Sequence, residues 1–284
     1  MSDAAWVKSD QQLAREERRR RLALRSATLA TISTVVLLGV VALIVLTSPG
    51  WPVVRRAFFS WPDAKASFPD IARAFWVNIT LFLTAEPVIL VIGLAVAVVR
   101  GTRSPVMFPL RALAIAYTDL FRGVPTLLLV FLVGFGLPAL NLQGVPTSPF
   151  VLGWIALILS YGAYVAEVFR AGIDSVHRNQ RASGRARGLT EAQTMRYVVL
   201  PQAVRNVIPP LLNDFVSLQK DTALVSVIGV VETLRVANVY ASSNFNYTPY
   251  VVAAMFFIVL TIPLARFTDR LTRRSVERQF GTSS

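Results

Sequence analysis

Six apolar stretches, each long enough to cross a lipid bilayer, limit how this 284-residue chain can fold. A helix needs roughly 20 apolar residues to span about 30 Å of hydrocarbon. Helices are expected because backbone polar groups in lipid must be paired within their own segment. The stretches cover residues 27–47, 75–99, 112–140, 151–172, 207–231 and 250–267. The sequence therefore predicts an all-α, polytopic membrane bundle with six transmembrane helices.

Composition agrees with lipid rather than water as the surrounding solvent. Hydrophobic residues make up 54% of the chain and charged residues only 16%, whereas a soluble domain carries about 25% charged residues. Cysteine is absent and His177 is the single histidine. Disulfides, thiolate or histidine metal sites and a catalytic triad are therefore not expected. We expect this chain to bind no metal.

The 29 lysines and arginines are distributed unequally between alternate loops of a six-span chain. Twenty-two lie in residues 1–25, 100–111, 170–205 and 266–284, and five lie in residues 48–74, 139–150 and 232–249. Loops rich in lysine and arginine stay on the cytoplasmic side. This pattern predicts cytoplasmic N- and C-termini in a cell membrane. It also explains the net charge of +13 without nucleic acid, which we do not expect as a partner.

The longest internal polar loop, residues 173–205, has the pattern of a docking element. Gly188 interrupts a run of helix formers, and Thr190 with Gln193 has the spacing of a capping box. Pro201 should end or kink the helix that follows. Such a unit could carry motion from a cytoplasmic partner to the bundle. An ordinary charged loop between helices explains the same residues equally well.

Several motifs in this order resemble those of polar amino acid permeases of ATP-binding-cassette (ABC) importers. Gly188, a nine-residue spacer, Val198 and then Leu200-Pro201 resemble the G-x₉-I-x-LP core of the family's EAA coupling loop. Residues 120–125 (LFRGVP), 163–170 (AYVAEVFR), 220–224 (KDTAL) and 227–229 (VIG) resemble motifs of the histidine/glutamate/glutamine/arginine permeases. The resemblance covers about residues 75–272.

The resemblance implies a five-helix importer core at residues 75–272, with its coupling loop at 173–205. Residues 1–48 would add a basic cytoplasmic tail and an extra first helix. Residues 49–74 would form an extracytoplasmic interfacial segment, and 273–284 a cytoplasmic tail. The expected function is a permease that moves polar amino acids across a prokaryotic cell membrane by alternating access.

The resemblance also implies three protein partners. Separate cytoplasmic ABC ATPase subunits would drive transport, an extracytoplasmic solute-binding protein would deliver substrate, and a second, identical or related permease chain would complete the path. No G-x-x-x-x-G-K-[ST] phosphate loop occurs. We therefore expect no cofactor in this chain, with ATP bound by the ATPase, and no enzymatic activity of its own.

The alternative is an ion-coupled secondary carrier or channel for a small polar solute. Its proton relays would be carboxylates inside the apolar stretches, such as Glu86, Glu167 and Asp221. That interpretation explains the buried charges but not the cytoplasmic docking loop.

By resemblance, the residues that couple to the ATPase are Ala182, Ser183, Gly184, Gly188, Leu189, Thr190, Val198, Leu200 and Pro201. The remaining family-motif residues are Arg122, Gly123, Pro125, Glu167 and Arg170. The sequence departs from the family in one place, because Ala182-Ser183-Gly184 stands where Glu-Ala-Ala is usual. The motif glutamate and any ionic contact it makes are missing. A partner permease with the intact motif is one explanation.

Charged side chains inside apolar stretches cost about 2.5–3.5 kcal/mol each on insertion scales, so they indicate function or pairing. Lys220 and Asp221 offer both signs, as a zwitterionic amino acid requires. We expect Asp221 to bind an ammonium group or a cationic side chain, with Glu86 and Tyr164 as further candidates. Structural pairing with other helices is the alternative. Asp119 and Arg122 are expected either to extend their charged ends to the cytoplasmic membrane surface or to form such a pair on one helix face.

Overall fold

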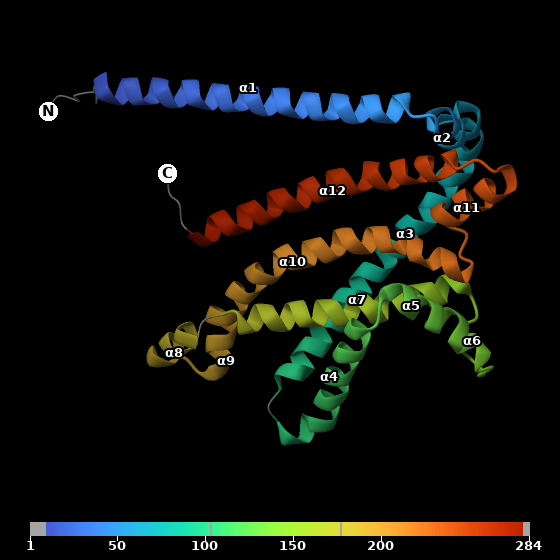
Figure 1. Ribbon diagram of the computed structural model, residues 1–284. Helices are drawn as coiled ribbons and strands as arrows, with labels where there is room; N and C mark the ends of the chain where they lie inside the picture. The colour runs from blue at the N-terminus through green and yellow to red at the C-terminus, as the bar shows by residue number, and fades with distance from the viewer. Residues whose placement is uncertain (1–9, 103, 177, 281–284) are drawn as a thin grey trace. The chain divides into compact units, whose positions relative to one another are not determined.

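The computed structural model describes residues 10–102, 104–176 and 178–280, which form helices and no strands. The all-α prediction is therefore confirmed. The chain divides into two compact units, Met1–Arg56 and Ala57–Ser284. The first unit contains α1 (Asp10–Thr47), a single long helix (Figure 1), and most of α2 (Trp51–Phe58). The apolar side chains of α1 are exposed, as expected of a helix that contacts lipid.

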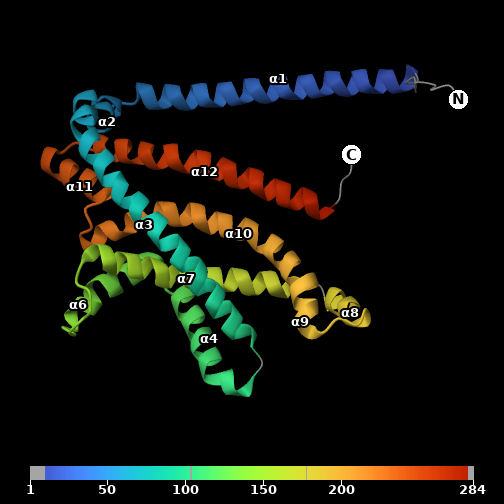
Figure 2. The same ribbon diagram turned by 180° about the vertical axis from the view of Figure 1, so that it is seen from behind.

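Four long helices form most of the second unit: α3 (Trp61–Gly101), α7 (Pro149–Asp174), α10 (Leu200–Asp221) and α12 (Thr248–Phe280). Helix α3 crosses α7 and α10 and packs against both (Figures 1 and 2). The helices approach closely where one of them has a glycine. A Cβ atom added at Gly93 would lie 2.4 Å from Val165 Cγ1, and one at Gly172 would lie 2.1 Å from Val207 Cγ1. Small residues at such contacts are typical of membrane helix packing.

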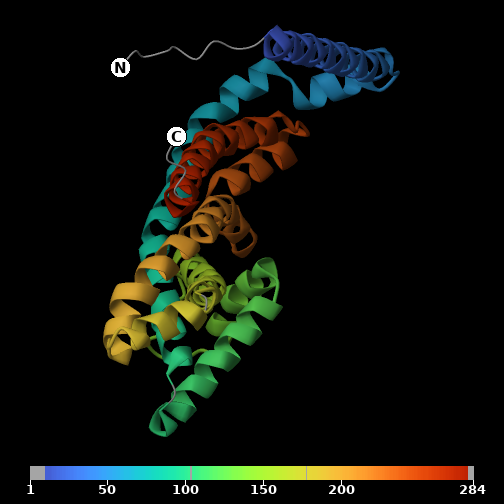
Figure 3. The same ribbon diagram turned by 90° about the vertical axis from the view of Figure 1, so that its left-hand side faces the viewer.

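The third apolar stretch is broken rather than continuous. A short turn at Pro105–Met107 leads into α4 (Phe108–Gly123), which forms a hairpin with the end of α3 (Figure 3). The next helices, α5 (Thr126–Phe131) and α6 (Leu137–Ala139), flank a π-turn and are bent by 107° from α4. Pro125 causes the break because proline disfavours a helical conformation in the residue before it. The prediction of one helix over residues 112–140 is wrong for this reason.

The fifth stretch is also bent. After α10, the 3₁₀ turn Thr222–Ile228 ends at Gly229, whose φ of 93° is left-handed and favours glycine. Helix α11 (Thr233–Asn244) then begins, bent by 49° from the preceding helix. Residues 232–249, expected as an outer loop, thus form a helix.

The number of possible membrane spans does not exceed the six that the sequence predicts. Among the described residues, four helices are long and apolar enough to cross a membrane, or up to six if each bent pair is one span. The predicted count of six therefore remains an upper value. The segment expected to be interfacial, residues 49–74, contains α2 and the first turns of α3.

The loop between α7 and α10 folds as its sequence predicts. Helices α8 (Arg178–Ala186) and α9 (Glu191–Thr194) are separated by Gly188, which has a left-handed φ of 80°. Thr190 N donates to Gln193 Oε1 (2.9 Å) and Gln193 N donates to Thr190 Oγ1 (3.2 Å), so the capping box is confirmed. A π-turn, Met195–Val199, joins α9 to α10. The helical segment therefore continues through Pro201, which lies in the first turn of α10.

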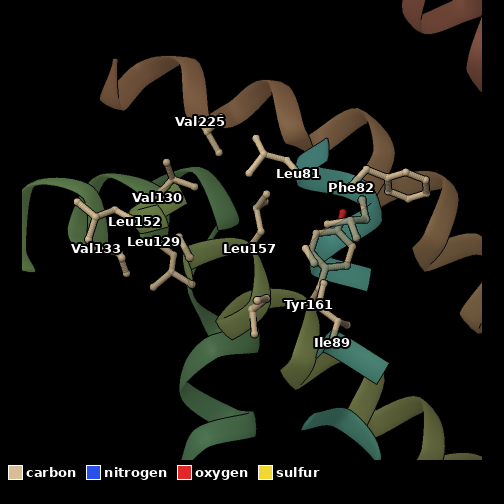
Figure 4. Close-up of a cluster of buried hydrophobic side chains, with 14 of the residues drawn as sticks. Leu81, Phe82, Ile89, Leu129, Val130, Val133, Leu152, Leu157, Tyr161 and Val225 are labelled. Carbon is tan, nitrogen blue, oxygen red and sulfur yellow. The ribbon is translucent and has the colours of Figure 1, made fainter. Parts of the chain in front are cut away.

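The main core lies where α3, α5, α7 and the 3₁₀ turn meet (Figure 4). Its members include Leu81 and Ile89 of α3, Val130 of α5, Leu157 of α7 and Val225 of the turn, each fully buried. The apolar core therefore holds both bent spans against the long helices.

Replacing Gly93 with alanine should destabilise the bundle by about 1–3 kcal/mol, because the new methyl group would overlap Val165 and approach Ala166 N to 3.1 Å. Gly101→Ala, in the same helix, is the control because nothing lies within 4 Å of its added Cβ. Thermal unfolding of both purified variants in detergent measures the difference. Equal unfolding temperatures would contradict the close packing of α3 on α7.

Candidate functional site

One carboxylate, Glu167 of α7, holds a cluster of arginines from three helices. Its Oε2 lies 2.9 Å from Arg100 Nη1 of α3 and 3.5 Å from Arg122 Nη1 of α4. Its Oε1 accepts from Arg170 Nη2, and Arg170 Nη1 also lies 2.6 Å from Asp174 Oδ2. These contacts join the last turns of α3 and α4 to α7.

Three residues expected from family motifs, Arg122, Glu167 and Arg170, thus meet in one ionic network. Gly123 and Pro125 lie at the 107° bend beside it. The expected pairing of Arg122 with Asp119 is wrong, because the arginine reaches Glu167 on another helix. Arg100 was not predicted as a site residue. Nothing in its local sequence shows that α3 ends against α7.

A second polar group lies deeper, around Tyr161 of α7. Tyr161 Oη donates to Asp221 Oδ2 at 2.7 Å, and the ring of Tyr161 lies 6.5 Å from that of Tyr164. Tyr164 Oη donates to the backbone oxygen of Arg122 at 3.3 Å. The predicted residues Asp221 and Tyr164 are therefore linked through Tyr161. Figure 4 places Tyr161 beside Ile89 and Phe82 of α3.

Glu86 of α3 belongs to the same region, because it lies close enough to Asp214 of α10 for their charges to interact. Tyr161 is also within electrostatic range of Asp214. Asp214 Oδ2 is buried and has no hydrogen-bond partner among the described residues. Asp214 could have been selected from its position inside an apolar stretch. Lys220, in contrast, is exposed, whereas Asp221 is half-buried.

These carboxylates can attract a cation but do not form a metal centre. Within the described ranges, no group of three or more histidine, cysteine, aspartate or glutamate side chains could hold a metal ion. An unpaired buried oxygen on Asp214 can accept a hydrogen bond from an ammonium or guanidinium group.

The α8–α9 segment presents small side chains together with polar and basic ones such as Arg187 and Arg196. Ala182 and Ser183 are exposed, as are Thr190, Leu200 and Pro201, while Leu189 and Val198 are partly buried. Gly184 is buried against Thr194, and an added Cβ would lie 2.8 Å from Thr194 Cγ2. The alanine usual in the family at this place would not fit here without a shift, which is a physical reason for the departure.

Comparisons with known proteins agree with the motifs. Residues 89–276 match the family model described as "Binding-protein-dependent transport system inner membrane component". The "Probable glutamine ABC transporter permease protein GlnM" of Bacillus subtilis is 39% identical over 185 residues, 65% of this chain and 83% of that protein. The "Glutamine transport system permease protein GlnP" of Escherichia coli is 32% identical over 215 residues, 75% of this chain and 94% of that protein.

A solved structure has the same fold. It is described as "Crystal structure of an amino acid ABC transporter with histidines" and superimposes with a TM-score of 0.67 at 32% identity. The match covers 72% of this chain and 94% of that chain.

Glu167→Gln should lower the free energy of unfolding by about 1–3 kcal/mol, because it leaves the Arg100 guanidinium, only 13% exposed, without an anionic partner. Asp70→Asn is the control, since Asp70 pairs with Arg73 at 3.0 Å on the surface, where a pair contributes about 0–1 kcal/mol. Thermal unfolding of the purified variants compares them. Equal losses would show that the Glu167 network adds no more than a surface pair.

Proposed function

The chain belongs to the family of binding-protein-dependent transport system inner membrane components, and we propose that it carries polar amino acids as the permease of an ABC importer. Family membership makes it a membrane-embedded transport component, not an enzyme, and implies an ATPase and a binding protein as partners. The observation that supports the substrate class most directly is the sequence identity to permeases named for glutamine.

In this proposal the α8–α9 segment faces the cytoplasm together with both termini. The excess of arginine in residues 170–205 supports this orientation. The ATPase would dock on the exposed face that includes Ala182, Ser183 and Tyr197. Because Ala182 replaces a glutamate, the docking contact would be apolar rather than ionic at that point. ATP is bound and hydrolysed by the partner, so this chain needs no cofactor.

Motion of α8 and α9 would reach the bundle through α7 and α10, which continue directly from the segment. Gly172 packs against Val207, so the ends of α7 and α10 move together. The Glu167 network then joins α7 to α3 and α4. ATP-driven closure of the ATPases would thus shift the population between inward-open and outward-open forms.

The substrate would pass the carboxylates near Tyr161. Glu86, Asp214 and Asp221 bring three carboxyl groups from α3 and α10 into one region. An amino acid carries an ammonium group, and a charge-assisted hydrogen bond contributes about 1.5–3 kcal/mol. A purely structural role is the alternative for Asp221, because it already accepts from Tyr161. A second permease chain, identical or related, would complete the path.

Reconstitution tests the proposal as a whole. The chain, with a candidate ATPase and binding protein, is placed in liposomes and offered labelled glutamine, arginine, histidine and glutamate. We expect uptake of at least one of them only when ATP and the binding protein are both present. Uptake driven by a proton gradient, without the ATPase, would instead identify an ion-coupled carrier.

Asp221→Asn should reduce uptake about tenfold, since removing a charge-assisted contact costs at least about 1.4 kcal/mol. Asparagine can still accept from Tyr161 Oη, so the fold should persist. Asp269→Asn, the same substitution at an exposed position of α12, is the matched control and should leave KM unchanged. Unaltered KM and rate for every amino acid in Asp221→Asn would assign Asp221 a structural role.

A further inference from the structure

A fully buried carboxylate, Glu232, lies at the bend between the 3₁₀ turn and α11. Its side chain is 0% exposed. Oε1 accepts from Arg235 N at 2.7 Å, and Oε2 accepts from Leu234 N at 2.9 Å. These two contacts cap the first turn of α11. A cap by itself does not need a buried charge, because serine, threonine, asparagine and aspartate cap helices at the surface.

The carboxylate has a third partner on a distant helix. Asn78 of α3, which is 1% exposed, donates from Nδ2 to Glu232 Oε2 at 3.0 Å. The same nitrogen donates to Thr222 Oγ1 of the 3₁₀ turn at 3.1 Å, and Asn78 Oδ1 accepts from Thr233 N at 3.2 Å. One amide therefore joins the elements on both sides of the bend. We call Asn78, Thr222 and Glu232 the bend cluster.

The bend cluster lies directly behind an open groove of about 840 Å³. The groove is lined by neighbours of Asn78, namely Ala74 and Val77, and by neighbours of Glu232, namely Val231 and Arg235. A change in the spacing of α3 and α11 would change this groove and the bend cluster together.

The other end of α3 carries Arg100, the partner of Glu167. Asn78 and Arg100 are 22 residues apart in one helix, which corresponds to about 33 Å at 1.5 Å per residue. Helix α3 thus connects the ionic network beside the α8–α9 segment with the bend cluster.

We propose that Asn78, Thr222 and Glu232 are positioning residues that lock α11 to α3, so that the two helices move as one body during transport. The inference rests on the proposed importer function. Gly229 could otherwise act as a free hinge between the 3₁₀ turn and α11. Parting α11 from α3 would leave the carboxylate with only its two backbone donors and would take from the buried Asn78 amide its partners Glu232 and Thr233. Buried polar groups that lose their hydrogen-bond partners are unfavourable. Motion delivered to α3 by the ionic network therefore reaches α11 only while the bend cluster is intact.

The test exchanges the charge and the amide between the two helices. Asn78→Asp sets two carboxylates against each other. Glu232→Gln removes the charge, and its single amide oxygen cannot keep all three contacts that the carboxylate accepts from Asn78 Nδ2, Leu234 N and Arg235 N. The double variant Asn78→Asp/Glu232→Gln restores a donor facing an acceptor. Asn238→Asp is the control for the same substitution on α11, because Asn238 contacts only Tyr250 Oη at an exposed position.

The main measurement is amino acid taken up per ATP hydrolysed in proteoliposomes. We expect at least a tenfold loss in Asn78→Asp with ATP hydrolysis retained, a smaller loss in Glu232→Gln, and recovery of at least half the wild-type ratio in the double variant. Asn238→Asp should match the wild type. If the bend cluster only caps α11, the substitutions at Asn78 and Glu232 should lower the unfolding temperature but leave the uptake per ATP hydrolysed unchanged, which would contradict the proposal.

A second measurement does not need transport. The chain has no cysteine, so Ser67→Cys places one thiol at a 1% exposed position on α3 in the wall of the groove. A maleimide should label this thiol slowly when Ser67→Cys is the only substitution. Labelling should be at least tenfold faster when Asn78→Asp is added, and slow again when Asn78→Asp and Glu232→Gln are both added. Labelling rates that do not differ would overturn the lock.

The outcomes separate the two proposals. If the wild type shows no ATP-dependent uptake, the importer function fails, and the labelling rates still test the lock. If the wild type transports and all variants keep its uptake per ATP, the lock is overturned. If Asn78→Asp cannot be purified, the double variant decides: it should fold and reach at least half the wild-type ratio, and a lower ratio contradicts direct pairing.

Discussion

Pairing of backbone polar groups away from water is the condition on which this bundle depends. A broken helix is tolerated at membrane depth only where protein groups satisfy the freed backbone atoms. At the second break, the Glu232 carboxylate accepts from two backbone nitrogens at the start of α11, and Asn78 accepts from a third. Near the first break, between α4 and α5, Tyr164 Oη donates a hydrogen bond to the backbone oxygen of Arg122. At both breaks, a polar side chain from another helix, Tyr164 or Asn78, therefore pairs with a backbone atom.

Helix α3 links the regions to which we assign function. One end contributes Arg100 to the Glu167 network, and the middle contributes Glu86 to the carboxylates near Tyr161. Further toward its start, Asn78 joins the bend cluster. Coupling, substrate passage and the bend in the α10–α11 span thus share a single helix. An importer needs such a connection because ATP is hydrolysed on one side while substrate arrives on the other.

The coupling segment illustrates how packing accounts for an unusual sequence. The glutamate expected from the family is replaced by Ala182, which is exposed, so its loss removes a surface contact and not a core one. Gly184 is buried, and its contact with Thr194 leaves no room for a methyl group. The departure from the motif thus combines a changed exposed side chain with close packing of α8 on α9.

Local properties of the residues were enough to predict the helical membrane class, the glycine break at Gly188 and the capping box of Thr190 and Gln193. Each depends on run length, backbone freedom or spacing within a few residues, and family motifs added the importer resemblance. The bends and the partners of Arg100, Asn78 and Glu232 were not predictable in this way. Glu232 lay in an expected loop, and Arg122 was paired with the wrong residue. Which helices become neighbours depends on packing between segments that can be 154 or more residues apart in the sequence, and no local pattern records that.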